Sequence, residues 1–74
     1  MTIQDVIRHS QTVAEVLECS VKFQRVKGTR GYLFSFSEID AVTTFTTYLK
    51  MQSDRGQLTY TKIPWESQVI VSMT

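Results

Sequence analysis

Tyr32-Leu33-Phe34-Ser35-Phe36 is the stretch that decides the fold. Large aromatic side chains occupy every second position, which is the period of a β-strand. If these aromatic side chains faced water, the core side of the strand would consist of Leu33, Ser35 and Ser37. Fully burying one Phe side chain is worth about 1.5–3 kcal/mol, so the aromatic side is expected to face the core.

The preceding segment has the same period. Cys19, Val21 and Phe23 alternate with polar side chains, and residues 27–31 (Lys-Gly-Thr-Arg-Gly) are typical of a turn. Residues 19–36 are therefore predicted to form a β-hairpin.

A helix is predicted on either side of this hairpin. Residues 3–18 carry apolar side chains at helical spacing after Thr2, a candidate N-cap with Asp5 three positions later. A second helix is predicted to begin after Ser37 as its N-cap, with an apolar stripe at positions 39, 42, 45 and 49, and to end at Arg55-Gly56. The four threonines within residues 43–47 also fit a strand, because β-branched residues are poor helix formers. The stripe, the cap and the length favour the helix.

The remaining residues predict a second hairpin. Residues 58–63 form one strand, 64–67 the turn and 68–73 a strand apolar enough to be central in a sheet. The order α-β-β-α-β-β predicts an α+β domain, with two helices on one face of a four-stranded, largely antiparallel sheet. The same order equals a ferredoxin-like βαββαβ fold whose first strand is moved to the end.

Length and composition bound the possible functions. A chain of 74 residues with 42% apolar residues makes one small domain, residues 1–74, for which self-association as a homodimer is a cheap stabiliser. A single cysteine and a single histidine exclude an internal disulfide and a four-ligand zinc site, so no metal or cofactor is expected. No long apolar run predicts a membrane segment, Asp5 lies where a signal peptide would be apolar, and a lone thiol suits the cytoplasm.

Catalytic groups are sparse. His9 and Ser10 are neighbours on a predicted helix and do not face each other, so His9 is interpreted as a surface residue. Cys19 is predicted to point inward, where a thiol behaves as a small hydrophobe; an active thiol would require it to be exposed. We expect a protein that is not an enzyme.

The basic residues are unevenly spread. Residues 19–36 hold half of the eight basic residues and no acidic one: Lys22, Arg25, Lys27 and Arg30. One interpretation is an edge of the sheet that is protected by charge against aggregation, and this is favoured. The other is a contact to nucleic-acid phosphates or an acidic partner.

Arg30, Gly31, Tyr32 and Phe34 also match positions of the RNA-recognition-motif signature, which this segment partly resembles. The resemblance implies that Tyr32 and Phe34 stack bases on an open sheet face while Arg30 holds a phosphate. Burial of the aromatic side opposes this implication, because it directs Tyr32 and Phe34 toward the helices.

Trp65 follows Pro64 in the predicted second turn, where it can pack over the sheet edge or anchor a partner. The expected function is a small, non-catalytic, protein-binding regulator or adaptor that self-associates. Its partner-binding residues are predicted to be Trp65, Arg25, Lys27 and Arg30. The alternative function is nucleic-acid binding by Lys22, Arg25, Lys27 and Arg30.

Overall fold

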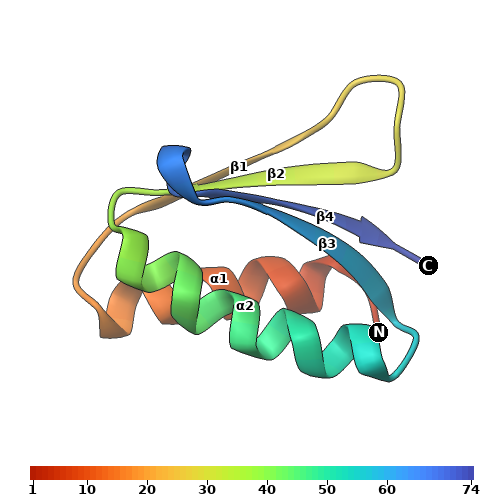
Figure 1. The fold of residues 1–74 in the computed structure, drawn as a ribbon, viewed down its shortest axis with the longest axis horizontal. Coiled ribbons are helices and arrows are strands. Elements are labelled where there is room, and N and C mark those ends of the chain that lie inside the picture. The colour runs from red at the N-terminus through yellow and green to blue at the C-terminus, as the bar shows by residue number, and fades with distance from the viewer.

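The computed structural model describes all 74 residues. Two helices lie side by side under one face of a four-stranded sheet (Figure 1). This arrangement confirms the predicted α+β class and the order of its elements. The elements are α1 (Ile3–Val16), β1 (Val21–Arg25), β2 (Gly31–Phe36), α2 (Ile39–Asp54), β3 (Leu58–Ile63), the short 3₁₀ helix η1 (Pro64–Glu66) and β4 (Gln68–Met73).

The strands lie in the order β1-β2-β4-β3, and every neighbouring pair is antiparallel. Strands β2 and β3 are therefore parallel to each other, with β4 between them and α2 as their connection, which is a split βαβ unit. Placing β4 ahead of α1 would generate a second such unit, with β2 between β4 and β1. The topology is thus that of a ferredoxin-like fold with its first strand moved to the end. Strands β1 and β3 are the two edges.

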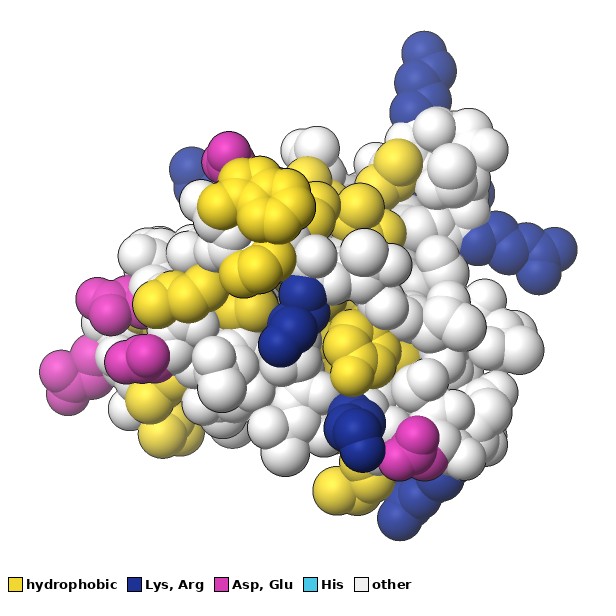
Figure 2. Space-filling model, viewed as in Figure 1, with side chains coloured by type: hydrophobic (Ala, Val, Ile, Leu, Met, Phe, Trp, Pro, Cys, Tyr) yellow, Lys and Arg dark blue, Asp and Glu magenta, His cyan; other side chains and the backbone are white.

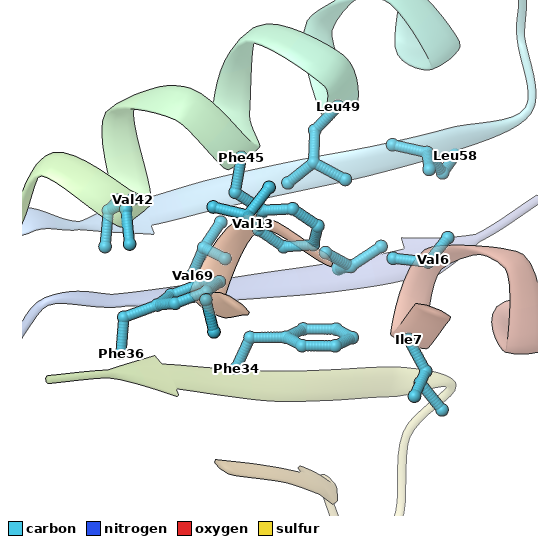
Figure 3. Packing of buried hydrophobic residues seen from close by; sticks show 13 residues of the cluster. Val6, Ile7, Val13, Phe34, Phe36, Val42, Phe45, Leu49, Leu58 and Val69 are labelled. Atoms are coloured by element: carbon cyan, nitrogen blue, oxygen red, sulfur yellow. The ribbon is translucent and has the colours of Figure 1, made fainter. Parts of the chain in front are cut away.

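The core lies between the helices and the sheet (Figure 3). Phe34 of β2 is fully buried and packs against Phe45 of α2, with ring centroids 5.2 Å apart. Phe36 is also buried, which confirms that the aromatic side of this strand faces the helices. Val69 and Val71 are fully buried in β4, as predicted for a central strand.

Helix α2 accommodates its threonines by bonding their hydroxyl groups to its own backbone. The hydroxyl of Thr44 donates to the carbonyl of Asp40, and that of Thr47 donates to the carbonyl of Thr43, both at 3.1 Å. These bonds satisfy the hydroxyl groups without leaving the helix. The helix rather than the strand interpretation of residues 42–49 is correct.

The start of α2 differs from the prediction. Glu38, not Ser37, occupies the N-cap position. The hydroxyl oxygen of Ser37 instead accepts a hydrogen bond of 2.9 Å from the backbone N–H of Ser20. The Ser37 side chain therefore joins the segment before β1 to the segment after β2 and does not cap the helix.

Several apolar side chains predicted to be in the core are exposed. Helix α1 ends at Val16 rather than at residue 18, and Val16 is 73% exposed and Leu17 38% exposed. Ile39 begins α2 at the same end of the molecule and is 47% exposed. Phe23 is on the predicted face but 43% exposed, because β1 is an edge strand with a neighbour on one side only.

Candidate partner-binding surfaces

The predicted partner-binding residues fall at opposite ends of the sheet. Strand pairing joins Arg25 to Tyr32 and Tyr32 to Val71 at one end. It joins Ile63 to Gln68 and Gln68 to Ser35 at the other, next to η1. Figure 1 shows the hairpin and both chain termini at the right and η1 at the left. Trp65 and the basic hairpin therefore form two separate surfaces.

The tip of the basic hairpin is held by its own hydrogen bonds. The backbone N–H of Val26 donates to the carbonyl of Gly31 at 2.8 Å, and that of Thr29 donates to the carbonyl of Val26 at 3.2 Å. Gly28 has φ +79°, a conformation that favours glycine. The Thr29 hydroxyl oxygen accepts the N–H of Gly31 at 3.0 Å. The loop is thus a defined platform for its basic side chains.

Arg25, Lys27 and Arg30 line one shallow hollow at this tip, together with Gly28 and Thr29. The structure therefore brings together three of the four basic residues in the nucleic-acid prediction. Lys22 does not line it, because it lies near the opposite end of β1.

A second hollow, of about 300 Å³, adjoins the first and shares Arg25 and Arg30 with it. Its other lining includes the apolar side chains of Met1, which precedes α1, and of Ile3 in α1, Tyr32 in β2 and Met73 in β4. Local sequence patterns could not reveal this site, because the start of α1 and the end of β4 meet only in the folded chain. We call the two hollows together the hairpin end.

Trp65 is 80% exposed, although the segment that carries it is well held. The N–H of Ser67 donates to the carbonyl of Pro64 at 3.1 Å, and the carbonyl of Ser67 accepts the N–H of Phe36 at 2.9 Å. The second bond ties the end of η1 to β2. Trp65 is therefore exposed to solvent on a fixed turn. It does not pack over the sheet edge, which was one of its two predicted roles.

We call the region around η1 the Trp65 end. Besides Trp65, the same end of the molecule carries the exposed apolar side chains Val16, Leu17 and Ile39, at the end of α1 and the start of α2. In Figure 2, apolar side chains gather around the η1 turn, with acidic side chains beside them at the left.

Charge is divided between the two ends. The half of the molecule toward Trp65 holds five of the seven acidic residues and two lysines: Glu15, Glu18, Glu38, Asp40, Glu66, Lys22 and Lys62. The half toward the hairpin holds the other six basic residues and only Asp5 and Asp54 as acids. In Figure 2, dark-blue side chains project from the hairpin at the upper right. The net charge is only +1, but the negative and positive charges are concentrated in opposite halves of the molecule.

The open face and the edges of the sheet are less suited to binding. Leu33 and Ile70 pair at the centre of the open face and are partly buried. The aromatic residues of the partial RNA-recognition-motif match point to the other face, so they cannot stack bases here. Each edge strand carries exposed basic side chains, Lys22 and Arg25 on β1 and Lys62 on β3, which hinder pairing with another sheet.

The remaining candidate residues are embedded in the fold. His9 is half-buried rather than on the surface, and its ring stacks on that of Tyr48 with centroids 3.8 Å apart. Burial lowers the pKa of His9 and raises that of Tyr48. Cys19 is half-buried against the core, as predicted. No three His, Cys, Asp or Glu side chains come close enough together to hold a metal ion.

Comparison with protein-family models, curated proteins and solved structures gave no match for this chain. Neither helix has the length and apolar character required to cross a lipid bilayer.

Proposed function

We propose that this protein is a small, non-catalytic regulator or adaptor that self-associates and binds other proteins through its Trp65 end. One observation carries the proposal: Trp65 is 80% exposed on a turn that is hydrogen-bonded to β2. Trp is enriched among the residues that dominate binding energy at protein interfaces. A cytoplasmic location suits the single free thiol.

The surroundings of Trp65 support a protein partner. Isolated apolar side chains on a surface are ordinary, but Val16, Leu17 and Ile39 are exposed at the same end. Five carboxylates lie in the same half of the molecule, and protein interfaces combine apolar side chains at their centre with polar and charged ones at their rim. A partner with basic and apolar side chains fits this chemistry.

Capture from native lysate tests the proposal. A tag on either terminus lies at the hairpin end and leaves the Trp65 end free. We expect the wild-type chain to retain a protein partner after nuclease treatment and in moderate salt. Trp65→Ala should lose that partner, whereas Met51→Ala, which removes an apolar side chain that is 49% exposed on α2, should keep it. An unchanged partner set with Trp65→Ala would refute the proposed surface.

A second candidate function is nucleic-acid binding by the hairpin end. The observation that favours it is the shared hollow of Arg25, Lys27 and Arg30. Affinity should then fall steeply with salt, with a slope that counts the phosphates neutralised.

The matching experiment compares two triple variants of equal charge change. Arg25→Ala/Lys27→Ala/Arg30→Ala should lose affinity for a DNA or RNA duplex and flatten the salt slope. Lys50→Ala/Arg55→Ala/Lys62→Ala should retain more of the affinity and a steeper salt slope than the hairpin variant does. Equal binding by the wild type and the hairpin variant would remove this candidate.

A further inference from the structure

We propose that the Trp65 end of one copy of this chain docks on the hairpin end of a second copy, so that the protein associates head to tail. The inference rests on the proposed function, since it uses the same surface and names its occupant. The two ends differ in shape and in charge, and each offers what the other lacks.

The charges oppose a symmetric pairing of like ends. A two-fold dimer places the same surface on both subunits. Joining two Trp65 ends would bring together two halves that each carry five carboxylates against two lysines, Lys22 and Lys62. Like charges placed opposite each other across an interface are costly, whereas complementary charges select the partner and its orientation. The opposite ends of two copies satisfy this condition.

The hairpin end also offers a place for the indole ring. Ile3, Met73 and Tyr32 supply apolar lining in the hollow of about 300 Å³, and Arg25 and Arg30 line it as well. A guanidinium group binds favourably over the face of a Trp ring. Glu66 is exposed immediately after Trp65 and would pair with these arginines once the ring is seated. Such a contact buries an aromatic anchor and pairs a charge beside it.

The edges of the sheet do not compete for this role. Lys22 and Arg25 on β1 and Lys62 on β3 hinder the joining of two sheets edge to edge. Because the two docking surfaces lie at opposite ends of the molecule, a copy that uses one surface leaves the other free. Head-to-tail contacts therefore give a dimer first, and then rings or open chains as concentration rises.

The experiment is sedimentation velocity on untagged, nucleic-acid-free protein over a range of concentrations, since a tag would lie beside the hollow. We expect the wild type to form larger species as concentration rises, and added salt to weaken them. Trp65→Ala and Arg25→Glu/Arg30→Glu should each weaken association at least about tenfold. Far-UV circular dichroism checks that each variant is folded.

Mixing the two variants gives the decisive result. Trp65→Ala retains an intact hairpin end, and Arg25→Glu/Arg30→Glu retains an intact Trp65 end. An equimolar mixture should form a one-to-one dimer that cannot grow further. Met51→Ala should behave as the wild type does. Lys50→Glu/Arg55→Glu reverses the same number of charges outside the two hollows and should weaken association much less than Arg25→Glu/Arg30→Glu does.

Several outcomes would overturn the inference. They are a wild type that stays monomeric at all concentrations, a mixture that shows no dimer, and an Arg25→Glu/Arg30→Glu variant that associates normally, as a symmetric Trp65 contact would predict. A monomeric wild type whose Trp65 still captures another protein from lysate would remove self-association and the second copy as occupant, but it would leave the protein-binding part of the proposed function standing.

Discussion

The backbone N–H of Phe36 donates a 2.9 Å hydrogen bond to the carbonyl oxygen of Ser67. This bond joins the last residue of β2 to the residue that ends η1. It places the exposed Trp65 on a turn fixed to a strand of the core. Ser67 reaches the required position with φ +53°, in the left-handed region that non-glycine residues rarely adopt.

The conformation of Ser67 gives the first prediction. Ser67→Gly should be as stable as the wild type or slightly more stable, because glycine adopts positive φ without a Cβ clash. Ser67→Val should destabilise the fold by about 1–2 kcal/mol, since a β-branched side chain is strained there. Urea denaturation measures both values. Ser72→Val in the extended strand β4 is the control and should be near neutral; a tolerated valine at position 67 would contradict the turn described above.

Two phenylalanines on the same face of the sheet should differ sharply in their contribution to stability. Phe34 is fully buried, so Phe34→Ala should cost about 3–5 kcal/mol in the free energy of unfolding. Phe23 pairs directly opposite it but is 43% exposed, so Phe23→Ala should cost much less. Chemical denaturation compares the two variants. Similar losses would mean that β1 is covered, for example by a second copy.

The threonines test the assignment of α2. Thr44 and Thr47 are exposed on a helix, so alanine at either position should stabilise the protein by a few tenths of a kcal/mol through its better helix propensity. Thr59 and Thr61 are exposed on strand β3, where alanine fits less well and should destabilise. Thermal unfolding of the four single variants checks the opposite signs. Destabilisation at Thr44 and Thr47 would favour the strand interpretation of this segment.

The stacked pair His9 and Tyr48 predicts a pH dependence. Burial holds the pKa of His9 below its usual value of 6.5. The unfolded chain therefore binds a proton at His9 more readily than the folded chain does. The contribution of His9 to the free energy of unfolding is fully present above pH 6.5, and it is lost as the pH drops through the lower pKa of the folded state. His9→Gln should remove this part of the pH profile of urea unfolding.

Asp5 contributes to the pH dependence of the free energy of unfolding at a lower pH than His9 does. A hydrogen bond from the backbone N–H of Thr2 lowers the pKa of Asp5 below 3.8, so its contribution is lost only in more acid solution. Asp5→Asn should leave the loss that begins near pH 6.5 in place. If His9→Gln keeps that loss, the stacked histidine is not its source.

Periodicity and turn residues were sufficient to determine the class of fold and the order of the elements. The alternation in residues 32–36 identified both the strand and the side that is buried, because exposing Phe34 and Phe36 would cost more than any local preference gains. The ambiguous threonine segment was resolved in the same way, by the apolar stripe that includes Phe45. The exposure of Ile39 and Val16 escaped such reasoning, since a stripe does not show where a helix extends past its sheet.

The sequence by itself determined the two hairpins, the two helices and the identity of the basic and aromatic residues that can bind. Only the tertiary structure decided where these residues lie relative to one another. Trp65 and Arg30 are separated because β4 runs antiparallel to β2, so that the turns that precede these two strands lie at opposite ends of the sheet. The hollow at the hairpin end likewise depends on Ile3 and Met73, from the first and last elements, lining the same space. Local periodicity is set by neighbouring residues, whereas these juxtapositions are set by strand order and by burial of the shared core.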